Sequence, residues 1–262
     1  MLRKLQGNTA LILAITAMVI LALLREIAFF PIPDMIPNPD SSWLIYAAQR
    51  MADGEKLYVD FMETNPPLIL WISLLPVWAG RFLDISPFTA FPLLVTFLNI
   101  ASMYLVAKIM RGHNTLGAKP VFQSVLLYIA FGFFLLSPAV YGQRELLFIS
   151  LVLPYLVKSL LKERTRKTPL DFIIIAMAAI GFAIKPFFLL LWGLNELHKA
   201  IQERNILSIF ALRNWVIGIV QLVYFVVIYY FTPEYISVIL PAVFTTYFAY
   251  ETLWSSILKI IA

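Results

Sequence analysis

The chain has 262 residues, of which 61% are hydrophobic and 13% are charged, and its mean hydropathy is +0.85. Soluble domains are about 45–50% apolar and about 25% charged, so this composition excludes an ordinary soluble domain and predicts an integral membrane protein. The apolar runs approach the ~20 residues that a membrane helix needs, and they are too long and continuous for barrel strands. We therefore expect an all-α, polytopic membrane protein with a single transmembrane domain over residues 1–262.

The net charge of +5 is concentrated in the connections between apolar segments. This distribution is typical of cytoplasmic loops in membrane proteins, and we expect no nucleic-acid partner. The basic groups are Arg3 and Lys4; Lys108, Arg111 and Lys119; Lys162, Arg164, Arg166 and Lys167; and Lys199, Arg204 and Arg213. The chain contains no cysteine, which excludes disulfides, thiolate metal sites and a cysteine nucleophile.

The first apolar segment, Thr9–Phe30, follows a basic pair, which predicts a cytoplasmic N-terminus and an outer loop at residues 31–66. Within that loop, apolar residues spaced four apart, beginning at Trp43, predict a helix over residues 41–52 that lies at the outer membrane interface. Asp40 directly precedes this helix. It is a good helix cap, and capping is compatible with a functional carboxylate because it fixes where the side chain points.

Two apolar runs, Pro67–Gly80 and Ile85–Met110, separate the outer loop from the next basic connection. Only an odd number of crossings can join the outside to the inside. We interpret the short, proline-broken Pro67–Gly80 as a helix that lies along or dips into the outer face, and Ile85–Met110 as the second full span. In the alternative, both runs cross, and Lys108–Lys119 lies outside against its charge.

The rest of the chain is expected to cross the membrane repeatedly. The predicted segments are Val121–Ala139 outward, Leu146–Leu161 inward, Phe172–Ile184 outward, Phe187–Gly193 inward to the charged stretch Glu196–Arg213, and Trp215–Phe231 outward. The pair Lys185-Pro186 interrupts one apolar run, and we interpret it as a short hairpin with Lys185 at the outer tip. The alternative is a single tilted helix through Lys185, which would bury an unpaired ammonium group.

Polar residues gather in the predicted outer connections. The stretch Tyr58–Pro67 contains Asp60, Glu63 and Asn65, although an interfacial loop that stops at the two prolines is its simpler interpretation. The turn Gln143-Arg144-Glu145 either marks a membrane boundary or faces a polar cavity, where charged groups are usually functional.

Lys185 offers the same choice between a structural and a functional role. Its side chain can extend to the membrane surface, or its ammonium group can bind a lipid phosphate as a point charge.

Taken in order, these segments resemble the GT-C superfamily of membrane glycosyltransferases, which use polyprenyl-phosphate sugars and include protein O-mannosyltransferases and aminoarabinose transferases. The resemblance rests on Asp40-Ser41-Ser42-Trp43-Leu44-Ile45-Tyr46-Ala47-Ala48-Gln49-Arg50, Gly54, Leu57-Tyr58-Val59-Asp60, Asn65-Pro66-Pro67, Gly142-Gln143-Arg144-Glu145 and Gly181 through Lys185-Pro186. It covers residues 1 to about 195 and implies a transmembrane helix bundle with juxtamembrane helices on its outer face.

The resemblance implies inverting sugar transfer from a polyprenyl-phosphate donor to an extracytoplasmic glycan, lipid or protein, in a bacterial inner membrane with the active side outward. Asp40 would be the catalytic base, because a hydroxyl acceptor needs a group that takes its proton. Arg144 and Lys185 would stabilise the departing phosphate. Glu145 would be the second catalytic carboxylate, orienting Arg144 or holding Mg²⁺ or Mn²⁺ together with Asp40. The expected substrate contacts are Asp60, Glu63, Asn65 and Gln143.

The chain departs from the family pattern at two positions and in its length. Many members have Asp-Glu where this chain has Asp40-Ser41, and Asn65 replaces a Lys or His before the two prolines. The family's large C-terminal part is absent from this sequence, so we expect a longer protein of which this is the N-terminal half, or a partner subunit. The alternative functions are a lipid or sugar transporter or flippase, and a noncatalytic scaffold subunit.

Overall fold

The computed structural model describes residues 2–29, 39–113, 117–136, 140–161 and 169–246, and these are almost entirely helical. No strand occurs in these ranges beyond an isolated bridge between Leu57 and Phe61. The helices are α1 Leu2–Phe29, α2 Pro39–Ala52, α3 Pro67–Leu83, α4 Pro87–Arg111, α5 Lys119–Phe134, α6 Arg144–Leu160, α7 Pro169–Ala183, α8 Phe188–Glu203 and α9 Leu212–Phe231, with short helical turns η2 Ile206–Phe210 and η3 Tyr235–Ile239. The predicted all-α class is confirmed.

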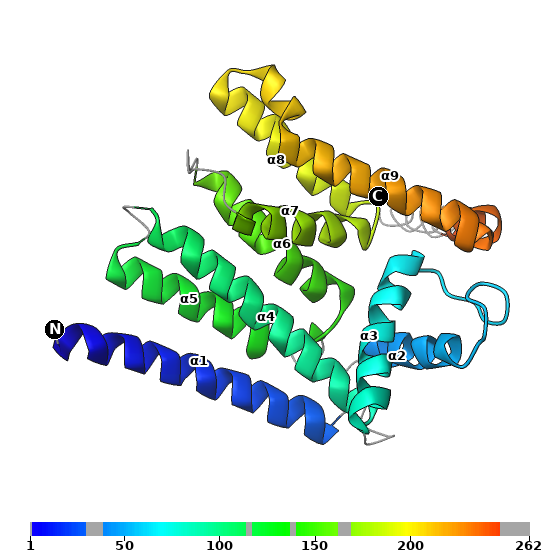
Figure 1. Ribbon diagram of the computed structural model, residues 1–262, viewed down its shortest axis with the longest axis horizontal. Helices are drawn as coiled ribbons and strands as arrows, with labels where there is room; N and C mark the ends of the chain where they lie inside the picture. The colour runs from blue at the N-terminus through cyan, green and yellow to red at the C-terminus, as the bar shows by residue number, and fades with distance from the viewer. Residues whose placement is uncertain (1, 30–38, 114–116, 137–139, 162–168, 247–262) are drawn as a thin grey trace, which may run out of the picture.

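The long helices lie side by side in a row, and at one end of it α3 runs crosswise with α2 beside it (Figure 1). We call α2 and α3 together the crosswise helices. Helix α1 packs on α5 and α4, α4 packs on α6, α6 on α7, and α7 on α9. Helices α2 and α3 pack on each other, and α3 packs on α4. The two crosswise helices are therefore attached to the row mainly through α4.

Prolines and a serine set where several of these helices begin. Pro67 and Pro87 are the first residues of α3 and α4, where a missing backbone N–H costs no helical hydrogen bond. Ser86 caps α4 by accepting the backbone N–H of Phe88 at 3.2 Å. Because α3 ends at Leu83 and α4 begins at Pro87, the chain reverses within a short connection.

Helix α3 begins where the predicted short helix does and extends three residues past Gly80. Pro76 lies inside it without ending it, and the Ser73 hydroxyl donates to the carbonyl of Ile69 at 2.8 Å. At 17 residues, α3 falls short of the ~20 residues that a perpendicular crossing requires. Its crosswise position agrees with a helix on or near one face (Figure 1).

Within the described ranges, three segments are long and apolar enough to cross a membrane: Thr9–Ile27 of α1, Pro87–Arg111 and Leu212–Phe231. The apolar helix Lys119–Phe134 is shorter than the predicted segment Val121–Ala139, whereas Pro169–Ala183 begins before the predicted segment Phe172–Ile184 and ends one residue before it. The C-terminal ends of α4, α6 and α8 lie at the same end of the row as the N-terminus, opposite α2 and α3 (Figure 1). Lys108 and Arg111 in the last turn of α4 therefore lie at this end, as the sequence predicts, and the predicted basic connection Lys162–Lys167 lies outside the described residues.

The predicted break at Lys185 is confirmed, because α7 ends at Ala183 and α8 starts at Phe188. A single helix through Lys185 is therefore wrong. The segment after the break differs from the prediction in another way. Helix α8 continues to Glu203, so it includes the start of the predicted charged stretch, and Glu196 is buried.

The helices of the row are joined by hydrogen bonds between buried polar groups as well as by apolar contacts. The Ser150 hydroxyl of α6 donates to Asn99 Oδ1 of α4 at 2.5 Å, and Gln221 Nε2 of α9 donates to the Ala179 carbonyl of α7 at 2.8 Å. In an apolar environment the polar groups of a helix find partners on neighbouring helices, and these bonds fix the register of each pair.

Helices α6 and α7 approach closely at Gly181. A methyl group added there would lie 2.6 Å from Val152 Cγ2 and 3.0 Å from Leu151 Cβ. Gly181→Ala should therefore destabilise the fold by about 1–3 kcal/mol through overpacking, seen as a lower melting temperature in detergent. Gly132→Ala on α5 is the matched control, because open space surrounds Gly132. Equal melting temperatures for the two variants would contradict this packing.

Candidate functional site

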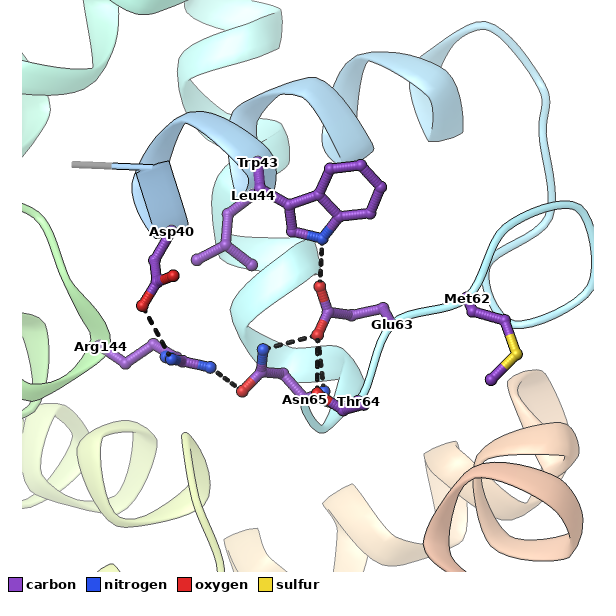
Figure 2. A pocket seen from close by; sticks show the side chains of 8 residues that line it. All are labelled: Asp40, Trp43, Leu44, Met62, Glu63, Thr64, Asn65 and Arg144. Carbon is purple, nitrogen blue, oxygen red and sulfur yellow. Dashed lines mark hydrogen bonds and ion pairs between the residues drawn. The ribbon is translucent and has the colours of Figure 1, made fainter. Parts of the chain in front are cut away.

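A cavity of about 350 Å³ opens where the crosswise helices meet the start of α6. It is lined by residues from α2, from the segment before α3 and from α6 (Figure 2). These are Asp40, Trp43, Leu44, Met62, Glu63, Thr64, Asn65 and Arg144. Four of the predicted site residues, Asp40, Glu63, Asn65 and Arg144, are thus brought together from two separate predicted outer connections.

Asp40 and Arg144 form an ion pair across this cavity. Arg144 Nη2 lies 3.5 Å from Asp40 Oδ2, although the two residues are 104 positions apart. The Arg144 side chain is only 16% exposed, whereas that of Asp40 is 57% exposed. Asp40 therefore keeps much of its carboxylate open to the cavity and to solvent.

The predicted capping role of Asp40 is wrong. Helix α2 already begins at Pro39, so Asp40 lies in the first helical turn and not at the position that precedes it. A carboxylate in the first turn is still favourable, because it interacts with the positive end of the helix dipole.

The turn before α6 determines where Arg144 points. Gly142 has a φ of +77°, and a side chain there would meet the Phe91 ring at 2.3 Å, so only glycine fits. Tyr141 is buried beneath this turn, its hydroxyl is hydrogen-bonded to Thr96 of α4, and burial raises the pKa of Tyr141 to about 12. Arg144 follows at the first position of α6. The loop is therefore attached to the bundle core directly before Arg144.

Glu63 organises the other wall of the cavity. Its carboxylate is buried; Oε1 accepts from the backbone N–H of Asn65 at 2.8 Å and from Asn65 Nδ2 at 2.6 Å, and Oε2 accepts from Trp43 Nε1 at 2.5 Å. Because the Asn65 amide nitrogen donates to Glu63, its Oδ1 faces Arg144 Nη1 and accepts a hydrogen bond from it (Figure 2). Trp43, Glu63, Asn65 and Arg144 thus form one continuous network.

A second ion pair lies beside the first. Lys185, in the turn between α7 and α8, places Nζ 2.6 Å from Glu145 Oε1 in the first turn of α6. Burial by itself would raise the pKa of Glu145, but the hydrogen bond from Lys185 and the nearby charges of Lys185 and Arg144 outweigh it and lower that pKa below its ordinary value. The predicted neighbourhood of Glu145 and Lys185 is therefore present, but neither residue lines the cavity that Asp40 and Arg144 share.

Two predicted contact residues lie outside the cavity lining. Asp60 is exposed and accepts the backbone N–H of Lys56 at 2.7 Å, so it closes a local turn instead of facing the cavity. Gln143 occupies the position before α6, in an extended conformation, and is also absent from the lining.

The contribution of Trp43 to the cavity wall was not predicted, because its partner Glu63 is 20 residues away and no local pattern connects them.

The predicted metal site does not fit the residues that the structure describes. Asp40 and Glu145 are each engaged by a cation, Arg144 and Lys185 respectively. Within the described part of the chain, no group of three or more histidine, cysteine, aspartate or glutamate residues could hold a metal ion. A divalent ion would have to displace the two ion pairs, so Mg²⁺ or Mn²⁺ binding stays a prediction from the resemblance alone.

Comparison with known proteins gives no relative: no family model, no curated protein and no solved structure matches this chain.

Glu63→Gln tests the network. A glutamine has one acceptor oxygen where the wild type uses two, so its amide N–H₂ must face either the Trp43 or the Asn65 donor. We expect a loss of about 1–3 kcal/mol in unfolding free energy, because a buried donor loses its partner. The measurement is thermal unfolding in detergent, with Glu55→Gln as the control, since Glu55 is partly exposed in a pair with Arg50. A Glu63→Gln protein as stable as the control variant would show that the network is unimportant for the fold.

The Lys185–Glu145 ion pair should make the melting temperature of the protein depend on pH. Because the pKa of Glu145 is lowered by folding, its stabilising contribution is present above the ordinary glutamate pKa and is lost as the pH falls through the lowered folded-state value. Lys185→Met should therefore reduce the melting temperature near neutral pH and progressively less on acidification to about pH 3. Lys108→Met, which removes an exposed lysine at the other end of α4, should give a difference that does not vary with pH. A pH-independent effect of Lys185→Met would refute the assignment.

Proposed function

We propose that this protein is a membrane glycosyltransferase, or the catalytic half of one, that transfers a sugar from a polyprenyl-phosphate donor to an extracytoplasmic acceptor by inversion. The single observation that supports this best is the position of Asp40. Its carboxylate lies across a small cavity from the Arg144 guanidinium, beside the Lys185–Glu145 pair. Asp40 and Arg144 line the cavity and supply an acid and a cation of the kind that such a transfer needs. Lys185 adds a second cation, which is paired with Glu145, the residue after Arg144, and lies outside the cavity lining.

Asp40 is suited to act as the base. It is the more exposed member of its ion pair, and only one of its oxygens contacts Arg144. In the proposed reaction, Asp40 takes the proton of the acceptor hydroxyl while that oxygen attacks the anomeric carbon of the sugar. The bond between the anomeric carbon and the phosphate oxygen breaks on the opposite side, which inverts the configuration, and the polyprenyl phosphate departs with the electron pair.

Arg144 is suited to receive the phosphate. Its Nη groups contact Asn65 and Asp40, whereas its buried Nε has no hydrogen-bond partner among the described residues. A buried donor without a partner is costly, and a ligand oxygen would remove that cost. Charge-assisted bonds from a guanidinium to a phosphate are strong and directional, so Arg144 would stabilise the charge that grows on the leaving group.

Asp40→Asn should reduce transfer by about 10²- to 10⁴-fold, because an amide cannot accept the proton of the acceptor. The asparagine side chain has almost the same shape and can still accept from Arg144, so the protein should fold normally. The measurement is transfer of radiolabelled sugar from a polyprenyl-phosphate donor in membranes that contain the full-length protein.

Asp60→Asn is the matched control, since it makes the same chemical change outside the cavity and should leave transfer unchanged. Full transfer by Asp40→Asn would remove the central assignment. If neither wild type nor variant transfers sugar while the wild type moves labelled lipid across proteoliposomes without acceptor, the protein is a flippase instead.

A further inference from the structure

A larger cavity, of about 920 Å³, lies at the end of the row opposite to the Asp40 site. Its walls come from the C-terminal halves of α6 and α8 and from the N-terminal ends of α7 and α9. Lys108 and Arg111 in the last turn of α4 lie at this end, which the charge pattern predicts to be cytoplasmic. The described cavity lining includes three basic side chains, Lys158, Lys199 and Arg213, and two acidic ones, Asp171 and Glu203.

A buried glutamate organises the cationic wall. Glu196 accepts from Tyr155 Oη at 2.7 Å, from Asn214 Nδ2 at 2.7 Å and from Arg213 Nη2 at 2.9 Å. These contacts join α6, α8 and α9 at one carboxylate. Glu196 balances a single positive charge, yet Arg213 and Lys199 both lie beside it.

The two cations therefore keep unused binding capacity. Arg213 Nε is buried and has no hydrogen-bond partner within the described ranges, and Lys199 Nζ lies 3.7 Å from Glu196 Oε1, which is too long for a hydrogen bond. The Lys199 side chain is 15% exposed, and burial lowers the pKa of its ammonium group more than Glu196 raises it. Both observations indicate cations with too little negative charge around them.

The acidic residues of the lining limit which anion can bind. Lys158 and Asp171 form an ion pair and neutralise each other. Glu203 is exposed at the rim, where it would repel a ligand of purely negative charge. A ligand with a phosphate and an ammonium group matches this arrangement better, because its positive group can face Glu203.

The apolar part of the lining indicates that the ligand is a lipid. Phe172 and Ile175 of α7 and Val216 of α9 line the cavity, and Phe172 is 58% exposed on the outer surface of the row. This wall lies on helices whose exposed residues are largely apolar, where acyl chains would lie. Basic pockets between membrane helices are known to bind lipid headgroups.

We propose that this cavity binds a zwitterionic phospholipid with a primary-amine headgroup, its phosphate on Lys199 and Arg213, its ammonium group facing Glu203 and an acyl chain along Phe172. The site is separate from the Asp40 cavity and does not depend on the reaction proposed there. It would hold α6, α7, α8 and α9 together at the end where Glu196 already joins three of them.

The test is lipid binding to the purified full-length chain in detergent, measured by native mass spectrometry. Phosphatidylethanolamine should bind several-fold more tightly than phosphatidylcholine, whose quaternary ammonium has no proton to donate, and than phosphatidylglycerol, which has no ammonium group. Lys199→Gln should weaken phosphatidylethanolamine binding about tenfold, the effect of losing one hydrogen bond to a charged group. Lys108 is an exposed lysine at the same end of the row but outside the cavity, so Lys108→Gln should bind phosphatidylethanolamine as tightly as wild type does.

Glu203→Gln is a second variant that does not depend on the buried cluster, because Glu203 is exposed. This substitution should reduce the ratio of phosphatidylethanolamine binding to phosphatidylglycerol binding. If Lys199→Gln does not fold, the Glu203→Gln result alone tests the proposal. Equal binding of the three lipids, or an unchanged preference in Glu203→Gln, would overturn the proposal. Displacement of the lipid by an equal concentration of soluble phosphoethanolamine would also overturn it, since the site would then recognise a free phosphate compound.

Discussion

The arrangement of the site depends on one guanidinium group. Arg144, at the first position of α6, reaches the crosswise helices through Asp40 of α2 and through Asn65 before α3. The segment from α2 to α3 also packs on α4, and the backbone N–H of Leu68 donates to Tyr224 Oη of α9 at 3.1 Å. Because the Arg144 side chain is mostly buried, it is screened less by solvent than a surface arginine, and its orientation is determined by the groups it contacts.

The groups that position Arg144 are rigid for separate reasons. Gly142 lies against Phe91, and Tyr141 is anchored in the core by Thr96, so the turn has little freedom before α6 begins. On the facing side, the buried Glu63 accepts three of the hydrogen bonds that orient Trp43 and Asn65. A site held on both sides in this way is preorganised, and binding energy need not be used to assemble it.

Carboxylates and cations are paired differently at the two ends of the molecule. At the Asp40 end, Asp40 and Glu145 each face one cation, Glu63 accepts hydrogen bonds from uncharged donors, and Asp40 lines a small cavity. At the opposite end, one buried glutamate is shared by two cations in a cavity with an apolar wall. The first arrangement suits the transfer of a proton and the departure of a phosphate, and the second suits a stable complex with a headgroup.

The sequence by itself determined the class of the protein and much of the list of site residues. Long apolar runs, basic connections and the Lys185-Pro186 break are local features, so they predicted the helices, the end at which the positive charge lies and the hairpin after α7. Asp40 was found in the polar loop after the first apolar segment, Arg144 and Glu145 in a short polar turn, and Lys185 between apolar segments, and their roles were predicted from the family resemblance. Only the tertiary structure decided which of them meet. Asp60 differs from Glu63 by three positions and has the same chemistry, yet one closes an exposed turn and the other is buried beside Trp43. Glu196 was predicted only as the start of a charged stretch, and it is buried because its partners come from α6 and α9, whose packing on α8 no local pattern encodes.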